Sequence, residues 1–426
     1  YMSNYSNKFI KFLEHLFIIC ALLYYLLDLN FRLDRIGDLQ ILFFNLKVIG
    51  KGFGYFLYTI NLYLFFVNRQ QVISNVKKNK YFGFLLLFVL GSIFWSYTPI
   101  KTFFSILSLF NITLFSIYLT TGYSLKKQLE LLAFAFGIIV SLSLITIFAF
   151  PSYGTMQTGL AIGSWEGIYG NRNILGGMSL LSALIFYLFS QISTKYFFLG
   201  WFGLSASVCL IIGSASRSAL VNTLVLLIVL PSYRVFRMNF RRSLYFWTIF
   251  TAFGGLLIIF CLFNAETILS LMGRDLTLSS RTILWKAELD YFWQQPWFGY
   301  GYQGFWHYIR STSNYPGIMR IANFHSHNGF LELTMDLGLL GLSIFIFTYL
   351  HKYFQAIVFI QKNNTRESFW HLYYLTFLFI TNLTETRLLG FNIFYLLWVT
   401  TVFGLTSDLK ENRVLWNSAD CEIPKK

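Results

Sequence analysis

Charged residues are scarce in this chain. They make up 12% of its 426 residues, whereas 56% are hydrophobic and 20% aromatic, and the mean hydropathy is +0.57. A soluble domain has about 25% charged residues, and a single hydrophobic core stops growing near about 250–300 residues. A soluble fold of this length would leave too much apolar surface in water. The composition therefore indicates a protein whose main solvent is lipid.

Cysteine is also rare, with four residues. Cys20, Cys209 and Cys261 lie inside apolar runs, which excludes a secreted domain held together by disulfides. Long apolar runs, in contrast, are abundant. A membrane-spanning helix needs about 20 mostly apolar residues, and roughly twelve segments meet that description. They are 12–27, 52–68, 81–97, 102–122, 128–150, 173–192, 197–213, 217–232, 245–266, 332–350, 368–384 and 388–406.

These runs predict an all-α polytopic integral membrane protein with about twelve transmembrane helices. We expect four regions. Residues 1–266 hold transmembrane helices 1–9 with an outer loop over 151–172, residues 267–331 form a large extracytoplasmic loop between helices 9 and 10, residues 332–406 hold helices 10–12, and residues 407–426 form a cytoplasmic tail.

The net charge of +15 is best interpreted as a signal of membrane topology. Basic residues gather in the short loops on the side of the N-terminus, for example at Lys77 and Lys78 and at Arg241 and Arg242. Such loops are typically cytoplasmic and are attracted to anionic lipids. We therefore expect both termini in the cytoplasm of a multi-pass protein, contacts with membrane lipids, and no nucleic-acid partner.

The long outer loop has its own pattern. Ser279 and Ser280 can cap a helix from Arg281 to about Gln294. The glycine-aromatic stretch 297–306 follows and contains the spacing G-x-G-x-x-G at 299–304. A dinucleotide site would need a preceding strand and a βαβ unit, and neither is predicted here. These glycines more plausibly allow tight turns among bulky rings, in a lid that lies on the membrane surface.

Tryptophans of this loop have two possible roles. Trp285, Trp297 and Trp306 can stack on sugar rings or anchor the loop at the membrane interface. Interfacial tryptophan is common in membrane proteins, so the sequence favours anchoring.

Five arginines on the predicted outer face are candidates for binding an anion. An arginine between two spans is costly to desolvate and usually serves a partner or a pathway. Converging guanidinium groups match the oxygens of a phosphate. The alternative for each is anchoring to lipid headgroups or an ion pair. The five are Arg172, Arg217, Arg274, Arg281 and Arg320.

Two histidines lie where the long loop enters the tenth predicted span. His325 and His327 could suggest a metal, but zinc needs three or four ligands, and Glu332 and Asp336 are too few and oddly spaced. We expect no metal. An imidazole can also accept a proton near neutral pH, which makes His327 a candidate general base.

The residues around these histidines form a recognisable pattern. His327-Asn328, nine residues, Gly338, two residues and Gly341 resemble the H-N-x9-G-x-x-G signature of the O-antigen ligase and polymerase family of bacterial membrane proteins. The segments 95–105, 165–177, 273–306 and 382–388 also resemble this family, and 273–306 is most similar to exopolysaccharide polymerases. The resemblance covers roughly residues 90–390, with one departure, Ser280, where we expect glycine.

This resemblance implies a GT-C-like helical fold and a glycosyltransferase of the bacterial plasma (inner) membrane, with its active site on the extracytoplasmic face. The donor and acceptor would be undecaprenyl-diphosphate-linked glycans, with no cofactor or metal. A chain-length regulator is a possible further partner. The predicted catalytic residues are His327, Arg217 and Arg281, and the predicted substrate-binding residues are Arg172, Asn328, His325, Arg274 and Arg320.

Three functions remain open at this point. The leading hypothesis is a surface-polysaccharide polymerase that moves a growing lipid-linked chain onto a new lipid-linked repeat unit. A ligase would instead move the finished glycan to lipid A-core, or to a protein as an O-oligosaccharyltransferase does. A flippase of lipid-linked sugars is the remote alternative, because it would place charges deep within the spans, whereas here they gather at the outer ends of spans and in one loop.

Overall fold

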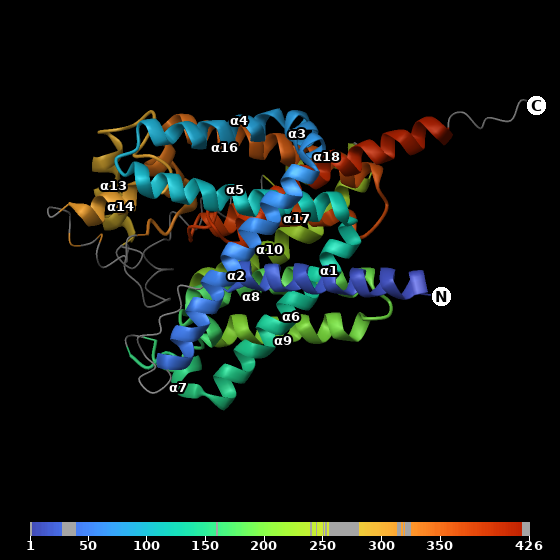
Figure 1. Cartoon of the computed structure of the whole chain (residues 1–426), viewed down its shortest axis with the longest axis horizontal. Helices are drawn as coiled ribbons and strands as arrows, with labels where there is room; N and C mark the ends of the chain where they lie inside the picture. Colours follow the sequence, from blue (N-terminus) through green and yellow to red (C-terminus); the bar gives the residue numbers. More distant parts are fainter. Residues whose placement is uncertain are drawn as a thin grey trace, which may run out of the picture.

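The computed structural model describes residues 2–27, 40–158, 161–238, 281–312 and 325–419, with the shorter pieces 241–243, 245–249, 251, 254, 317 and 319 (Figure 1). The regular elements in this part of the chain are helices, apart from an isolated bridge between Thr155 and Trp165. Its main helices are α1 (Met2–Leu26), α2 (Gln40–Val67), α3 (Arg69–Lys78), α4 (Lys80–Gly91), α5 (Pro99–Gly122), α6 (Leu125–Ala149), α8 (Arg172–Ile192), α9 (Phe197–Gly213), α10 (Arg217–Ser232), α13 (Arg281–Phe292), α14 (Phe305–Ser311), α16 (Gly329–Lys362), α17 (Trp370–Asn382) and α18 (Ile393–Ala419). The short turns α7 (Pro151–Gly154), η2 (Ser92–Phe94), η3 (Gly167–Tyr169), η4 (Tyr233–Arg237) and η5 (Glu367–Phe369) connect them.

Five helices of the described chain are long and apolar enough to cross a membrane, and four shorter apolar helices lie at other predicted spans. An all-helical membrane protein is thus confirmed, whereas the number of about twelve spans stays a prediction. The structure begins and ends α9 and α10 at the predicted residues, and α13 begins at Arg281 as expected. The predicted span 245–266 falls mostly outside the described residues. α18 continues through most of the expected tail, to Ala419.

Polar caps define several helix starts. The side-chain oxygen of Asn171 accepts hydrogen bonds from the amides of Asn173 and Ile174 at the start of α8, and Ser216 accepts one from Ala219 at the start of α10. Such caps satisfy amides that lack a partner inside the helix. They therefore fix where α8 and α10 begin.

Small residues allow close packing between α8 and α9. Gly200 lies against the backbone of Ser190, Gly203 lies against the ring of Phe186, and the hydroxyls of Ser182 and Ser207 are 2.8 Å apart. Membrane helices associate through such close contacts because lipid supplies no hydrophobic driving force between them. Elsewhere α5 packs along α18, and α4 packs along α16.

Helix α16 is broken at Gly338, where φ is 67° and ψ is −173°. The glycine-aromatic loop fills the break: the amides of Leu339 and Leu340 donate to the carbonyls of Pro296 and Trp297, at 2.8 and 3.2 Å. In the other direction, the amides of Tyr300 and Gly301 donate to carbonyls of α16, Met335 and Asp336, both at 2.9 Å. The loop backbone thus completes the hydrogen bonds that the helix loses.

Asp336 strengthens this junction between loop and helix. Its carboxylate, 7% exposed, accepts hydrogen bonds from the amides of Gln303 at 2.8 Å and Phe305 at 3.3 Å. Gly299 and Gly301 have φ values of 65° and 92°, a region open to glycine and costly for other residues. The G-x-G-x-x-G spacing is therefore a set of turns, as predicted.

The two ends of the helix bundle differ. Figure 1 shows the start of α1 and the end of α18 at one end, and α13 and α14 at the opposite end. Toward the end with α1, the buried amine of Lys352 in α16 donates to Asn79, Gln355 and Thr406 at 2.6–2.9 Å. It thereby joins α16, α18 and the junction of α3 with α4. The candidate site lies at the other end.

Candidate active site

Three of the predicted arginines are the first residues of helices. Arg172 starts α8, Arg217 starts α10 and Arg281 starts α13. His327 lies two residues before the start of α16 at Gly329. The N-terminus of a helix carries unpaired amides and a positive dipole end, both of which favour anions.

Glu385 joins three of these helix starts. It lies between α17 and α18, and its Oε1 faces Nη2 of Arg281 at 3.5 Å and accepts a hydrogen bond from the hydroxyl of Ser218 at 3.4 Å. Its Oε2 lies 3.9 Å from Nδ1 of His327. One carboxylate thus contacts residues of α10, of α13 and of the turn before α16.

The environment of Glu385 keeps it charged. Burial raises the pKa of its carboxyl, but His327, Arg387 and Arg281 together outweigh burial, so the pKa lies below its ordinary value. A charged Glu385 both balances Arg281 and attracts an N–H at Nδ1 of His327. In that tautomer Nε2 of the imidazole is free to accept a proton.

Arg281 is fixed at two points. Besides facing Glu385, it donates from Nη1 to the carbonyl of Thr384 at 2.9 Å. The hydroxyl of Thr384 accepts a hydrogen bond from the amide group of Asn222 in α10, at 3.2 Å. The first turn of α13 is therefore attached to the α17–α18 turn, which α10 in turn supports.

Arg172 and Arg217 lie on the α8 and α10 side of the site. Nη1 of Arg172 is 3.4 Å from the carbonyl of Ala215, in the turn that leads into α10. Arg217 is exposed, and its guanidinium makes no hydrogen bond or ion pair with another residue of the described chain. Its guanidinium is therefore available to an external anion.

The starts of α8 and α10 are attached to each other and to the α17–α18 turn. Ser216 donates from its hydroxyl to the side-chain oxygen of Asn173 at 3.0 Å, and the Arg387 guanidinium lies 3.4 Å from the carbonyl of Asn173. Arg387 is 7% exposed and lies over the ring of Phe394. Gly177 lies directly against this guanidinium, so a Cβ there would collide with it.

The remaining predicted residues have different positions. His325 is exposed, with its ring 6.4 Å from that of His327. Asn328 caps α16, because its side-chain oxygen accepts from the amides of Phe330 and Leu331. This oxygen is therefore used within the protein. Arg274 and Arg320 lie outside the described residues.

Sequence reasoning missed Glu385 and Arg387. Both lie in 382-NLTETRL-388, a segment that resembles the family, but the resemblance gives neither residue a role. Charges between two apolar runs are costly, which is the signal that singled out Arg217. The same signal applies to Glu385 and Arg387.

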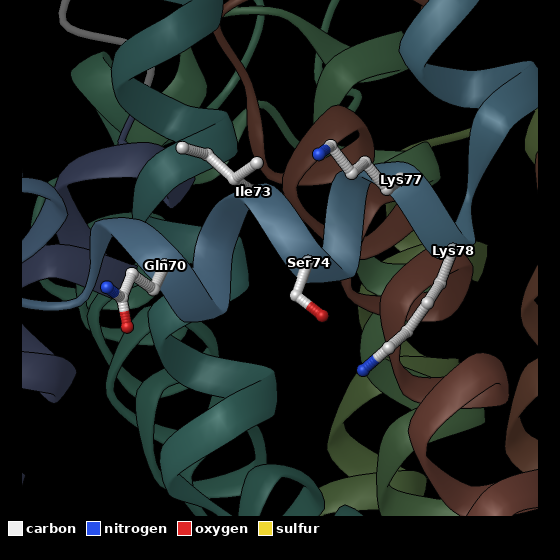
Figure 2. A pocket seen from close by; sticks show the side chains of 5 residues that line it. All are labelled: Gln70, Ile73, Ser74, Lys77 and Lys78. Atoms are coloured by element: carbon white, nitrogen blue, oxygen red, sulfur yellow. The ribbon is translucent and has the colours of Figure 1, made fainter.

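An open hollow of about 510 Å³ lies away from this site. Figure 2 shows that its lining comes from α3: Gln70, Ile73, Ser74, Lys77 and Lys78. It contains none of the histidines and arginines described above. Nor does the described part of the chain contain a group of three or more His, Cys, Asp or Glu side chains that could hold a metal.

The arrangement can support transfer to a hydroxyl group. A proton acceptor at His327, a carboxylate that orients it and several cations at helix starts lie within one cluster. Positively charged groups can stabilise a leaving group that gains negative charge, while the base takes a proton from the attacking hydroxyl.

Part of the chain is similar to a known protein family. Residues 202–346 match the family model described as O-antigen ligase. This stretch of the chain is therefore similar to the O-antigen ligase family. The resemblance predicted from the sequence is thus confirmed, and the matched stretch of the O-antigen ligase domain contains Arg217, Arg281 and His327, whereas Glu385 lies beyond it.

A curated relative extends the similarity. The chain is 23% identical over 305 residues to "Exopolysaccharide production protein ExoQ" of Rhizobium meliloti (strain 1021), which covers 67% of this chain and 67% of that protein. The family and this relative together indicate a membrane enzyme of polysaccharide biosynthesis.

Proposed function

We propose that this protein is a surface-polysaccharide polymerase with a GT-C-like helical fold and an active site on the extracytoplasmic face of the bacterial plasma membrane. It transfers an undecaprenyl-diphosphate-linked glycan chain onto a lipid-linked repeat unit, without a metal or cofactor. The observation that carries this proposal is the cluster in which Arg281, His327 and Ser218 meet at Glu385, next to the exposed Arg217.

In the proposed reaction, a hydroxyl of the acceptor sugar attacks the anomeric carbon of the donor. The new carbon–oxygen bond forms as the bond to the diphosphate breaks, and the hydroxyl proton passes to Nε2 of His327. Undecaprenyl diphosphate leaves with the bonding electron pair. Attack from the face opposite the diphosphate inverts the anomeric centre.

The arginines have different roles in this proposal. Arg217, exposed at the start of α10, binds the diphosphate directly, with Arg172 beside it on α8. Arg281 is already balanced by Glu385, so it adds less net charge and holds the carboxylate that orients the base. The contacts of Arg217 and Arg172 with the diphosphate stabilise the charge that develops on the leaving group.

A ligase is the second candidate, because the matching family model is described as O-antigen ligase. It would use the same donor and the same residues but would move the glycan to lipid A-core or to a protein. The polymerase is favoured because the curated relative is named for exopolysaccharide production.

The deciding experiment uses purified protein and a synthetic lipid-linked repeat unit, with mass measurement of the products. Ladders of longer chains support a polymerase. A single transfer to added lipid A-core, without ladders, identifies a ligase. If no glycan is transferred but the lipid-linked unit crosses the bilayer of vesicles that contain the protein, the protein is a flippase.

His327→Ala should abolish chain elongation in this assay, because a general base contributes about 10²–10⁴-fold to rate. His325→Ala is the matched control, since its ring is exposed and, unlike that of His327, forms no ion pair with Glu385 among the described residues, and we expect a milder loss. Wild-type product from the His327 variant, at equal protein in the membrane, would reject His327 as the base.

A further inference from the structure

Ser326 lies between the two histidines of the site and is completely buried. Its carbonyl accepts a hydrogen bond from Nε1 of Trp285 in α13 at 2.7 Å. Its amide donates to the carboxylate of Glu332 in α16 at 3.2 Å. The backbone before His327 is therefore held by one helix on each side.

The backbone of His327 needs such support. Its φ is 50°, in the left-handed region that residues other than glycine rarely adopt. A conformation of this kind persists only where the surroundings impose it. The contacts of Ser326 on one side and the cap formed by Asn328 on the other supply that constraint.

Glu288, one turn after Trp285 in α13, is a further polar residue near Ser326. It is 0% exposed, and it packs in the lid among apolar residues such as Leu284 and Phe292. The Ser326 hydroxyl and the Glu332 carboxylate are its polar neighbours. Within the described chain, neither its oxygens nor the Ser326 hydroxyl forms a well-aligned hydrogen bond with any group.

A charged carboxylate is unfavourable in this position. Burying an ion without a partner is strongly unfavourable, so a group of this kind takes up a proton instead. Burial raises the pKa of Glu288 to about 8, with the Ser326 hydroxyl opposing the shift and the Glu332 carboxylate adding to it. Near neutral pH, Glu288 is therefore mainly a carboxylic acid that can donate a hydrogen bond.

One side of α13 thus contacts two parts of the site. Arg281, at its start, contacts Thr384 and Glu385, and Trp285, four residues later, contacts Ser326. Residues three and four positions apart share a helix face, which places Glu288 on the same side. The helix that positions Arg281 therefore also positions the turn that carries His327.

We propose that Glu288 is an uncharged positioning residue, which together with Trp285 holds Ser326 and so sets the place of the His327 imidazole. The role of Glu288 in catalysis rests on the proposed function, in which His327 acts as the base. The protonated state of Glu288 does not depend on that assignment of His327.

Other ionisable groups on the elements around Glu288 come from four segments. Among the described residues, none forms an ion pair with Glu288. These ionisable groups are the exposed Lys286 and Asp290 of α13, His325 and His327 of the turn before α16, Glu332 and Asp336 of α16, and His307 and Arg310 of α14.

The activity test compares kcat and KM of the purified wild type, Glu288→Gln and Glu288→Ala between pH 6 and 9.5. Glutamine retains the shape of the side chain and is uncharged, so we expect wild-type kcat at pH 7. Alanine removes the contact, and displacement of the base lowers kcat by about 10²-fold with little change in KM. Asp290→Asn, an exposed acid on the same helix, is the matched control and should behave as wild type.

The pH dependence separates positioning from a general structural role. The wild-type kcat should fall above about pH 8 as Glu288 loses its proton. The kcat of Glu288→Gln divided by the kcat of wild type should therefore rise over that range. A Gln variant as inactive as the Ala variant would show that the charge is required. An Ala variant with wild-type kcat would show that Glu288 positions nothing. Either result overturns the proposal.

Thermal unfolding tests the buried proton without using activity. An acid whose pKa is raised in the folded protein contributes stability that is complete below its ordinary pKa and is lost as pH rises through the raised value. Glu288→Gln should therefore match wild type near pH 4.5 and unfold at a higher temperature at pH 8. Equal or lower stability of the variant at pH 8 contradicts an uncharged Glu288. If wild type makes no polymer but this difference is present, the proposed function fails, and the inference about the proton stands.

Discussion

At Glu385, one carboxylate oxygen faces Arg281 and Ser218 while the other faces His327. The same carboxylate therefore limits the net charge of the arginine and selects the tautomer of the histidine. Arg217 has no such partner in the described chain, although it too begins a helix. Two arginines of similar position thus differ in the charge that they offer to a substrate.

Glu385→Gln tests the orienting role directly. Glutamine keeps the size of the side chain but loses the charge that holds Arg281 and attracts Nδ1 of His327. We expect kcat for chain elongation to fall by about 10²-fold, the effect of a small misplacement of a catalytic group. Glu367→Gln, in η5 near the opposite end of α16, is the control and should leave kcat unchanged. An unaffected Glu385 variant would mean that His327 is oriented by another group.

Acid should weaken the wild type more than Glu385→Gln. The pKa of Glu385 lies below its ordinary value, because its charged neighbours outweigh burial. Its contribution to stability is therefore complete above the ordinary pKa and is lost as pH falls through the lowered value. The measurement is thermal unfolding in detergent from pH 6 to pH 3. A difference between the two proteins that does not change with pH would contradict this linkage.

At the scale of helices, the break in α16 is the feature that places the site. The loop 296–301 supplies backbone partners on both sides of Gly338, so the outer part of the helix, which follows His327, has a fixed position. Asp336 attaches the start of α14 to the same helix. The lid and the base are thus parts of one hydrogen-bonded unit.

Gly338→Ala should disturb this unit. The residue has φ of 67°, and a Cβ would collide with the backbone of Trp297. A non-glycine residue in such a conformation costs about 1–3 kcal/mol before the collision is counted. We expect a lower unfolding temperature and a lower kcat. Gly122→Ala is the control, because a Cβ at the end of α5 meets no atom within 4 Å. Equal effects of the two changes would show that the break needs no glycine.

The helices were largely predictable from the sequence because apolar runs and caps are local signals, as at α9 and α10. The break in α16 was not, since a glycine signature shows where a chain can bend but not which distant loop fills the bend. His327, Arg217 and Arg281 stood out as costly polar residues near apolar runs. Glu385 has the same signal, but only the folded chain shows which of these residues it contacts. For Trp285 the sequence favours interfacial anchoring over stacking on sugars, and both stay predictions; the hydrogen bond from its indole nitrogen to Ser326 is visible only in the folded chain.

At the scale of the whole molecule, α13 and α14 lie at the end opposite the start of α1 and the end of α18 (Figure 1). The basic residues of α3 include Lys77 and Lys78, and the sequence predicts that this side faces the cytoplasm. The candidate site would then face outward, where lipid-linked repeat units are joined in the proposed function.

Cysteine labelling tests this orientation. In a cysteine-free background, Lys286→Cys on α13 should react with a membrane-impermeant maleimide in spheroplasts. Lys77→Cys on α3 should react only after the membrane is permeabilised. Both lysines are exposed on the protein, so the two sites differ in side rather than in access. Labelling in the reverse pattern would place the candidate site in the cytoplasm and contradict the proposed function.

The order of the chain matters for the broken helix. Pro296 and Trp297, whose carbonyls accept from Leu339 and Leu340, precede α16 along the sequence. During synthesis these acceptors have therefore left the ribosome before the two amides that need them. Unpaired amides are costly inside a bilayer, so the loop that holds Pro296 and Trp297 can spare α16 that cost when the helix is inserted.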